Sequence, residues 1–431
     1  MNTKQTMLSV AQARDFLLNA AKSVSDIEWV ATLAANGRVL AQDQVSMIDV
    51  PSADNTQMDG YAVRAADCAN ADARLRISQR IPAGHVGQRL APGTAARIFT
   101  GALIPAGADA VVMQEQCRVE VDGEDHFVSI AHAPKLGEWV RRQGEDIRQQ
   151  ACILTAGTRL RPQELGLAAS VGLATLPVFR KLRVALFFTG DELSMPGEVL
   201  KPGAIYNSNR FLLTGLLQNL ACEISDFGIV PDQLDATRAT LRKAAQDHDL
   251  IITSGGVSVG EEDHIRPAVQ AEGRIDMWQI AVKPGKPLAF GEVYRGEQLS
   301  EQLSEQLSEQ QAQSQSKGAA FFLGLPGNPV SSFVTFCLFV RPFVLRMQNV
   351  ANSLPQAQKM RADFAWPRAD KRNEFLRAKR NASGGLSLFP NQSSGVLTST
   401  VWGDGLIDLA AGQTIVEGDL VDFIPFSEFD I

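Results

Sequence analysis

From about residue 180 onward, short apolar runs alternate with segments of helical periodicity, and this alternation limits the possible folds more than any other feature. Strands that alternate with helices predict a mostly parallel sheet with helices on both of its faces. The runs with strand character are 182–188, 222–230, 250–253 and 319–325, and the segments with helical character are 208–220, 235–248 and 326–340.

Two of these helices carry start signals. Ser208 precedes a stripe of apolar residues and is expected to be an N-cap. In the last helix, Asn328 is the expected cap and Pro329 occupies the first helical position, where its missing N–H has no cost.

The segments that follow the predicted strands hold the glycines and the acidic residues of this region. They read "TGDEL", "PD", "SGGVSVGEED" and "GLPGNP". Ligands of such sheets bind outside the carboxyl ends of the strands. The sequence therefore predicts a binding site at this one edge of the sheet.

The flanking regions differ from this core. Residues 27–147 hold short runs with frequent Gly and Pro, which indicates a β-rich region. Residues 355–431 show strand-length runs between Gly and Asp turns, which predicts a small β-barrel or sandwich.

One low-complexity segment, 297–317, repeats Glu-Gln-Leu-Ser. Its leucines at 299, 303 and 307 have helical spacing, so a docked helix is one alternative. Burying three leucines returns at most roughly 5–9 kcal/mol, whereas ordering about 21 residues costs about 20–40 kcal/mol. A disordered insertion in a surface connection is therefore the expectation.

Composition excludes several classes of function. The net charge is -7, and no basic block is long enough to follow a nucleic-acid backbone. Neither the five cysteines nor the five histidines form a metal-binding pair. The N-terminus is expected to be an amphipathic helix and not a signal peptide. The apolar run Val330–Val340, which Arg341-Pro342 closes, is too short to span a bilayer. A soluble, cytoplasmic protein is expected.

The Gly-rich segment 254–260 has two interpretations. It can be a tight turn between strand and helix, or a nest of backbone N–H groups that binds phosphate. Each nearby acid, taken singly, can be an ordinary helix N-terminal charge. Taken together, Asp191, Glu192 and Asp263 next to a phosphate nest indicate Mg²⁺ held between carboxylates and phosphates.

The segment "KPGKPLAF" (283–290) holds two lysines between prolines. Solvated lysines are the ordinary interpretation, but prolines that restrict the backbone favour fixed cations. A unit charge about 4 Å away in a partly shielded cleft is worth roughly 4 kcal/mol. Ser331 and Ser332 lie in the first turn of the last helix, where they can cap it or bind an oxyanion. A compact oxyanion is the predicted ligand.

The motifs as a set resemble those of the MoeA and gephyrin E-domain family, the molybdopterin molybdenumtransferases. The resemblance runs in order from residue 58 to residue 332. It rests on "MDGYAV" (58–63), "FTGALIPAGADAVV" (99–112), "EWVRRQGEDI" (138–147), "TGDEL" (189–193), "SGGVSVGEEDH" (254–264), "KPGKPLAFG" (283–291) and "GLPGNPVSS" (324–332).

The resemblance implies insertion of molybdate into adenylylated molybdopterin, with Mg²⁺-dependent release of AMP and formation of molybdenum cofactor. It implies a homodimer whose site uses both chains, with transient contacts to the molybdopterin adenylyltransferase and to molybdoenzyme-maturation proteins. It also implies four parts: a helical and linker part (1–26 with 148–179), a β-rich part (27–147), a MogA-like α/β part (180–347, with the insertion 297–317) and a C-terminal β-barrel (355–431).

Site residues follow from the matched motifs. The residues implied in catalysis are Asp59, Thr100, Asp191, Glu192, Asp263, Lys283 and Lys286, and of these Asp191, Glu192 and Asp263 would hold the metal ion. The residues implied in substrate binding are Asp232, Ser254, Gly255, Gly256, Ser258, Pro287, Gly327, Asn328, Ser331, Arg372 and Ser394. Ser393 stands where the family pattern has Gly, and Phe188 where a small hydroxyl residue is common.

Two other functions stay open on the sequence alone. One is adenylyl transfer to molybdopterin, the reaction of a related α/β domain, although the β-rich flanks favour the insertion step. The other is a gephyrin-like scaffold without catalysis, against which the intact carboxylates and lysines argue.

Overall fold

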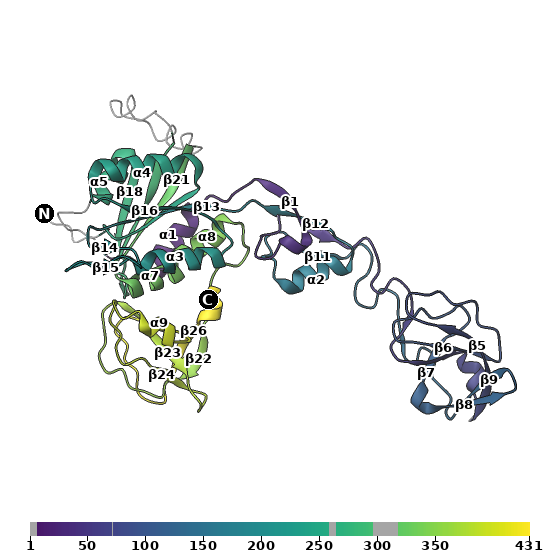
Figure 1. The fold of residues 1–431 in the computed structure, drawn as a ribbon. Coiled ribbons are helices and arrows are strands. Elements are labelled where there is room, and N and C mark those ends of the chain that lie inside the picture. The colour runs from purple at the N-terminus through teal and green to yellow at the C-terminus, as the bar shows by residue number, and fades with distance from the viewer. Residues whose placement is uncertain (1–6, 71, 258–263, 296–317) are drawn as a thin grey trace.

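The computed structural model describes residues 7–70, 72–257, 264–295 and 318–431. The predicted insertion 297–317 and the candidate residues Ser258 and Asp263 lie outside this part of the chain. Figure 1 shows an elongated molecule, in which a slender connection joins an α/β domain to a distant β domain.

The α/β domain is built on a mixed six-stranded sheet. Its first four strands in the order below are parallel to one another, as predicted for these runs, whereas β20 is antiparallel to both of its neighbours. The order is β16 (Glu223–Val230), β13 (Arg183–Thr189), β17 (Leu250–Ser254), β21 (Ala319–Leu325), β20 (Pro287–Tyr294) and β18 (Gly273–Gln279).

Helices cover both faces of this sheet because its strands are apolar on both sides. In β13, Leu186 and Phe188 belong to one core and Ala185 and Phe187 to the other, as the two-residue period of a strand requires. One face packs on α1 (Val10–Ala20), α3 (Ser208–Asn219), α7 (Pro329–Thr335) and α8 (Arg341–Met347), and the other on α4 (Leu234–Asp247) and α5 (Ile265–Glu272).

The last helix was expected to end before Arg341-Pro342, and this expectation is wrong. It continues from α7 through a π-helical turn, η6 (Phe336–Val340), into α8. Pro342 cannot donate a backbone hydrogen bond, and a π turn is one way in which a helix absorbs such a residue. The continuous helix, Pro329–Met347, is 19 residues long and apolar enough to span a membrane, but 94% of its apolar window is buried inside the protein, as in a core helix.

Two helix starts depend on their caps. The Asn207 side chain caps α3 by accepting a hydrogen bond from the Arg210 N–H, so the cap lies one residue before the predicted Ser208. At the start of α1, Ser9 and Gln12 form a reciprocal capping box.

The slender connection, here called the arm, pairs chain segments that are far apart in sequence. It contains β1 (Ile27–Ala31) paired with β12 (Thr175–Phe179), β2 (Gln44–Val45) paired with β11 (Cys152–Leu154), the 3-10 turn η1 (Thr32–Ala34) and α2 (Pro162–Ser170). The predicted boundary at residue 27 is therefore wrong, because residues 27–45 pair with 152–179. Residues 10–20 do not join the arm either, since α1 packs against the α/β domain.

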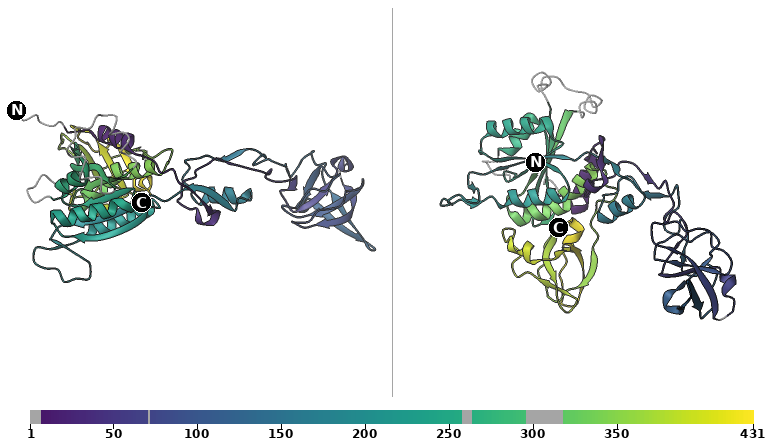
Figure 2. Two further views of the ribbon diagram at one scale, coloured as in Figure 1. Left: turned by 90° about the horizontal axis from the view of Figure 1, so that it is seen from above. Right: turned by 45° about the vertical axis from the view of Figure 1, so that its right-hand side comes forward.

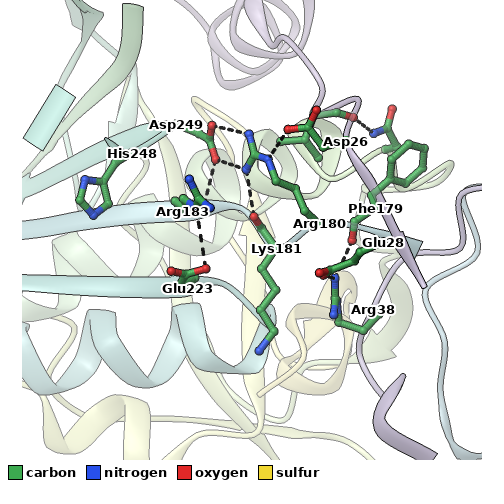
Figure 3. A network of polar contacts seen from close by, with 12 residues as sticks. Asp26, Glu28, Arg38, Phe179, Arg180, Lys181, Arg183, Glu223, His248 and Asp249 are labelled. Carbon is green, nitrogen blue, oxygen red and sulfur yellow. Dashed lines mark hydrogen bonds and ion pairs between the residues drawn. The ribbon is translucent and has the colours of Figure 1, made fainter. Parts of the chain in front are cut away.

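A network of charges joins the arm to the α/β sheet (Figure 3). The Arg180 guanidinium donates to both carboxylate oxygens of Asp249, at 2.6 and 2.8 Å, and to Asp26 at 2.8 Å. This forked geometry holds the arm's exit strand against the start of β17.

The β domain is a six-stranded sheet in which only β5 and β6 are parallel. A two-stranded ladder, β3 (Asn55–Thr56) with β10 (Val140–Arg141), pairs the segment that precedes this sheet with the segment that follows it. The sheet order is β7 (Ala110–Met113), β4 (Gly60–Val63), β6 (Thr94–Ile98), β5 (Ala73–Ile81), β9 (Asp125–Ile130) and β8 (Cys117–Asp122), with 3-10 turns η2 (Ala65–Cys68) and η3 (Gln114–Gln116).

The C-terminal domain takes its edge strand from the α/β domain. The short strand β19 (Val282–Lys283) pairs in parallel with β23. At the other end of the sheet, a bridge between Ala362 and Leu386 brings β22 toward β24. The sheet order is β19, β23 (Asn373–Arg380), β25 (Gly405–Leu409), β26 (Leu420–Pro425) and β22 (Gln358–Arg361), with β24 (Leu386–Leu388) on β23, α9 (Thr398–Trp402) and the turn η7 (Phe426–Phe429).

Candidate active site

The carboxyl ends of the parallel strands meet at a glycine turn. The Gly255 N–H donates to the Leu325 carbonyl at 3.1 Å, and a Cβ on Gly255 would lie 2.9 Å from the Thr189 carbonyl oxygen. Gly255 also has a φ of 99°, and Gly256 follows with a φ of 64°. Only glycine fits at position 255. The described part of the predicted Gly-rich turn therefore begins at the carboxyl end of β17, at the predicted edge of the sheet.

The Ser254 side chain is buried and is hydrogen-bonded within the protein. It is 3% exposed, its hydroxyl donates to the Pro326 carbonyl at 2.9 Å, and it accepts from the Asn209 amide at 2.8 Å. The same amide donates to the Gly327 carbonyl at 2.7 Å. Ser254 therefore fixes the loop that holds Gly327 and Asn328.

Two predicted metal ligands, Asp191 and Glu192, lie exposed just after β13. They line a hollow of about 550 Å³ together with β14 (Leu193–Ser194) and the loop with Lys201 that leads to β15 (Ile205–Tyr206). Asp232 lies between β16 and α4, at the same edge of the sheet. Within the described residues, no three acidic, histidine or cysteine side chains cluster closely enough to hold a metal ion.

The two lysines of the 283–287 loop have different environments. Lys283 forms ion pairs with Glu374 at 2.8 Å and Asp370 at 3.2 Å, both in the C-terminal domain, and the contact with Glu374 raises the pKa of Lys283. Lys286 is exposed, and within the described residues no carboxylate forms an ion pair with it. Of the two predicted oxyanion ligands, Lys283 is thus engaged in ion pairs, whereas Lys286 has none among the described residues.

The loop lies against the start of α7. A Cβ on Gly285 would meet the Thr335 hydroxyl at 2.5 Å and the Ser331 carbonyl at 3.4 Å. Asn328 is the N-cap residue of α7, as predicted, although its side chain makes no capping hydrogen bond. Ser331 is 5% exposed, in the first turn. Pro287 begins β20, so the loop is held at both ends by strands.

The C-terminal domain reaches this helix start through Ser394. Its carbonyl accepts a hydrogen bond from the Val330 N–H at 3.0 Å, which places the 393–395 turn beside α7. The structure thus brings Ser394 to the predicted site, by its backbone. Arg372 instead binds Asp370 at 2.9 and 3.0 Å, beside Lys283.

Arg377 was missed by the sequence analysis. It is completely buried and donates to the Ser399 hydroxyl, the Phe375 carbonyl and the Ser393 carbonyl, and burial lowers its pKa to about 10. Within the described residues it has no carboxylate partner. A buried positive charge therefore lies next to the 393–395 turn, whose Ser393 carbonyl it binds. The available signal was a lone arginine inside the apolar strand run "EFLRA".

Asp59 and Thr100 form one unit in the β domain. The Thr100 hydroxyl and N–H donate to the same oxygen of Asp59, at 2.6 and 2.8 Å, and these hydrogen bonds lower the pKa of Asp59. This pair lies far from the glycine turn and Lys286, because the β domain stays apart from the α/β domain in every view (Figure 2). One chain alone does not bring the predicted catalytic residues together.

Comparison with known proteins covers nearly the whole chain. Three family models match: the MoeA N-terminal region (domain I and II) at 8–172, a probable molybdopterin binding domain at 185–346 and the MoeA C-terminal region (domain IV) at 359–426. In solved structures, the chain resembles the molybdopterin biosynthesis moeA protein of Pyrococcus horikoshii, with 27% identity, a TM-score of 0.78 and coverage of 97% of this chain and 100% of that chain.

Two curated relatives that resemble this chain are named molybdopterin molybdenumtransferase. The protein from Haemophilus influenzae is 39% identical, over 80% of this chain and 78% of its own length. The protein from Nostoc is 35% identical, over 91% of this chain and 87% of its own length. With this identity over most of both lengths, the chain belongs to the MoeA family of molybdopterin molybdenumtransferases.

Proposed function

We propose that this protein inserts molybdate into adenylylated molybdopterin and releases AMP, which forms molybdenum cofactor. The observation that carries the proposal is the meeting of three elements at one place: the Lys286 loop, the start of α7 and the Ser394 turn. Molybdate is a tetrahedral dianion, and it suits an exposed lysine beside the N-terminal part of a helix, where the helix dipole is positive.

The glycine turn and the carboxylates suit the diphosphate of the same substrate. Backbone N–H groups of a glycine turn can approach phosphate oxygens closely. Mg²⁺ typically binds one or two carboxylates together with substrate phosphates, and the exposed pair Asp191 and Glu192 provides that donor set. Bound Mg²⁺ would neutralise charge on the phosphate oxygens while the diphosphate is cleaved.

We further propose that the active site forms between two subunits of a homodimer. The support is the distance between the Asp59–Thr100 pair and the α/β domain within one chain (Figures 1 and 2). A two-fold dimer can bring the β domain of one chain to the α/β domain of the other. An adenylylated pterin must come from an adenylyl transfer reaction. We therefore propose transient contact with the molybdopterin adenylyltransferase, and we propose that both proteins act in the cytoplasm.

A reconstituted assay tests the function. The purified protein is mixed with adenylylated molybdopterin, molybdate and Mg²⁺, and AMP is quantified together with molybdenum bound to the pterin. We expect AMP release that depends on both molybdate and Mg²⁺. Consumption of ATP with unmodified molybdopterin would instead identify an adenylyltransferase, and absence of both reactions would favour a scaffold.

A further inference from the structure

Two arginines lie side by side on the β domain, and one of them, Arg97, binds the residue that follows Asp59. Arg80 on β5 and Arg97 on β6 are direct partners in the parallel strand pair. Both guanidinium groups lie over the ring of Phe99, at 4.5 and 4.7 Å from its centre. Like charges directly opposite each other destabilise a sheet, so this pair has a cost in the isolated chain.

Neither charge is neutralised within the described residues, because no carboxylate forms an ion pair with Arg80 or Arg97. Arg97 donates to two neutral groups, the Gly60 carbonyl at 3.1 Å and the Gln114 side chain at 2.5 Å. These contacts and the aromatic rings of Tyr61 and Phe99 hold its guanidinium in place. Each arginine still has N–H donors for a ligand, since a guanidinium carries five.

The location of the pair connects it with the proposed active site. Gly60, which binds Arg97, follows Asp59 directly, and the positive charge of Arg97 contributes to the lowered pKa of Asp59. Two guanidinium groups face two carboxylates here, since Glu115 accepts a hydrogen bond from the same Gln114 side chain that binds Arg97. Neither carboxylate forms an ion pair with either arginine among the described residues, so the two guanidinium groups can attract a phosphate that Asp59 alone would repel.

We propose that Arg80 and Arg97 form a phosphate-binding pair that takes the diphosphate of the adenylylated substrate. This identification of the ligand rests on the proposed function and on the approach of the β domain to an α/β domain. The planar fork of arginine matches phosphate oxygens, and stacking on Phe99 orders the fork before the ligand arrives.

Binding of inorganic pyrophosphate to the full-length protein, measured by calorimetry without Mg²⁺, tests the pair independently of turnover. We expect Arg97→Gln to weaken binding about tenfold and Arg80→Gln about threefold, because a charged hydrogen bond is lost in each. Arg97→Lys keeps the charge without the fork and should recover part of the loss. Asp59→Asn removes a repelling charge and should strengthen binding.

Arg118→Gln is the matched control, since the Arg118 side chain is 85% exposed on β8 of the same domain. It should leave pyrophosphate binding unchanged. Wild-type binding that neither Arg80→Gln nor Arg97→Gln weakens would overturn the proposal, as would a wild-type protein that does not bind pyrophosphate. A changed oligomeric state in sedimentation, with unchanged binding per folded chain, would assign the arginines to a subunit contact and also overturn it. If binding follows the expectation but no AMP is released in the reconstituted assay, the pair stands and the proposed function fails.

Discussion

At the scale of single residues, the two lysines of one short loop differ in their ion pairs. Lys283 lies in β19, the strand that the α/β domain contributes to the C-terminal sheet, and it pairs with Glu374 and Asp370. Lys286 follows in the same loop, exposed, and the neighbouring Gly285 lies against α7. The first lysine joins two domains through ion pairs, and the second has no ion pair among the described residues.

This division predicts different results for Lys283→Met and Lys286→Met. Lys283→Met leaves the nearly buried Glu374, 2% exposed, without its cation. A fully buried pair loses about 3–5 kcal/mol on such a change, and because Lys283 is 40% exposed we expect about 1–2 kcal/mol, seen as a lower melting temperature. Lys286→Met should instead raise the molybdate concentration for half-maximal AMP release, with little change in melting temperature.

The control is Glu374→Gln in the Lys283→Met background, which removes the unpaired charge and should recover part of the lost stability. A Lys283→Met protein of normal stability with altered molybdate dependence would place Lys283 in the anion site after all.

The Asp59–Thr100 pair leads to a prediction about pH. Hydrogen bonds from Thr100 lower the pKa of Asp59, so the folded protein keeps this carboxylate ionised at a lower pH than a free aspartate. In the Thr100→Val variant the pKa should rise, and the acid side of the pH–activity profile should move to higher pH. The measurement is the pH dependence of AMP release for both proteins, with melting temperatures as the folding control. An unshifted acid limb would mean that Asp59 does not act as a carboxylate in the reaction.

At the scale of elements, the ends of the hairpin formed by β20 and β21 explain why this fold can accept a long segment between them. Tyr294 at the end of β20 is the direct partner of Ala319 at the start of β21, and the Arg295 N–H bonds to the Gly318 carbonyl. The two strands are therefore already closed by their own ladder, and a two-residue turn can join them.

Replacing residues 296–317 by Asn-Gly should change the melting temperature by no more than about 2 °C. The physical reason is that the ladder between β20 and β21 ends before the segment begins, and a shorter closed loop costs slightly less entropy. Thermal unfolding followed by circular dichroism checks this, with AMP release as a second readout. A drop of ten degrees would show that leucines 299, 303 and 307 dock on the domain.

At the scale of the whole molecule, fixed contacts join three of the four parts. Arg180 ties the arm to Asp249 of the sheet (Figure 3). Asp430, after the last turn of the chain, binds both Arg159 of the arm and Arg341 of α8. The β domain has no such contact with the α/β or the C-terminal domain among the described residues, and it meets the remainder of the chain through the arm.

A subunit-mixing experiment tests whether the β domain completes the partner's site. Asp59→Ala and Lys286→Ala proteins, each expected to be nearly inactive, are unfolded, mixed equally and refolded together. Random assortment makes about half of the dimers mixed, and each mixed dimer has one intact site, so roughly a quarter of wild-type activity should return. Each variant refolded alone is the control. If mass spectrometry confirms mixed dimers and activity does not return, each site is built within one chain.

The sequence by itself determined what depends on neighbours along the chain. Periodicity located the four parallel strands of the α/β domain and their helices, and the strand ends with Gly and Asp lie at one edge of the sheet, as predicted. It also determined the family, because long motifs occur in a fixed order. The domain boundary at residue 27 failed because β1 pairs with β12, about 145 residues later, and no local pattern encodes that pairing. Lys283 and Lys286 look alike in sequence, and the approach of Glu374 and Asp370 in the folded chain is what gives Lys283 a domain contact. Arg377 and the Arg80–Arg97 pair were likewise decided by tertiary structure, since burial and unpaired charge arise only when distant strands meet.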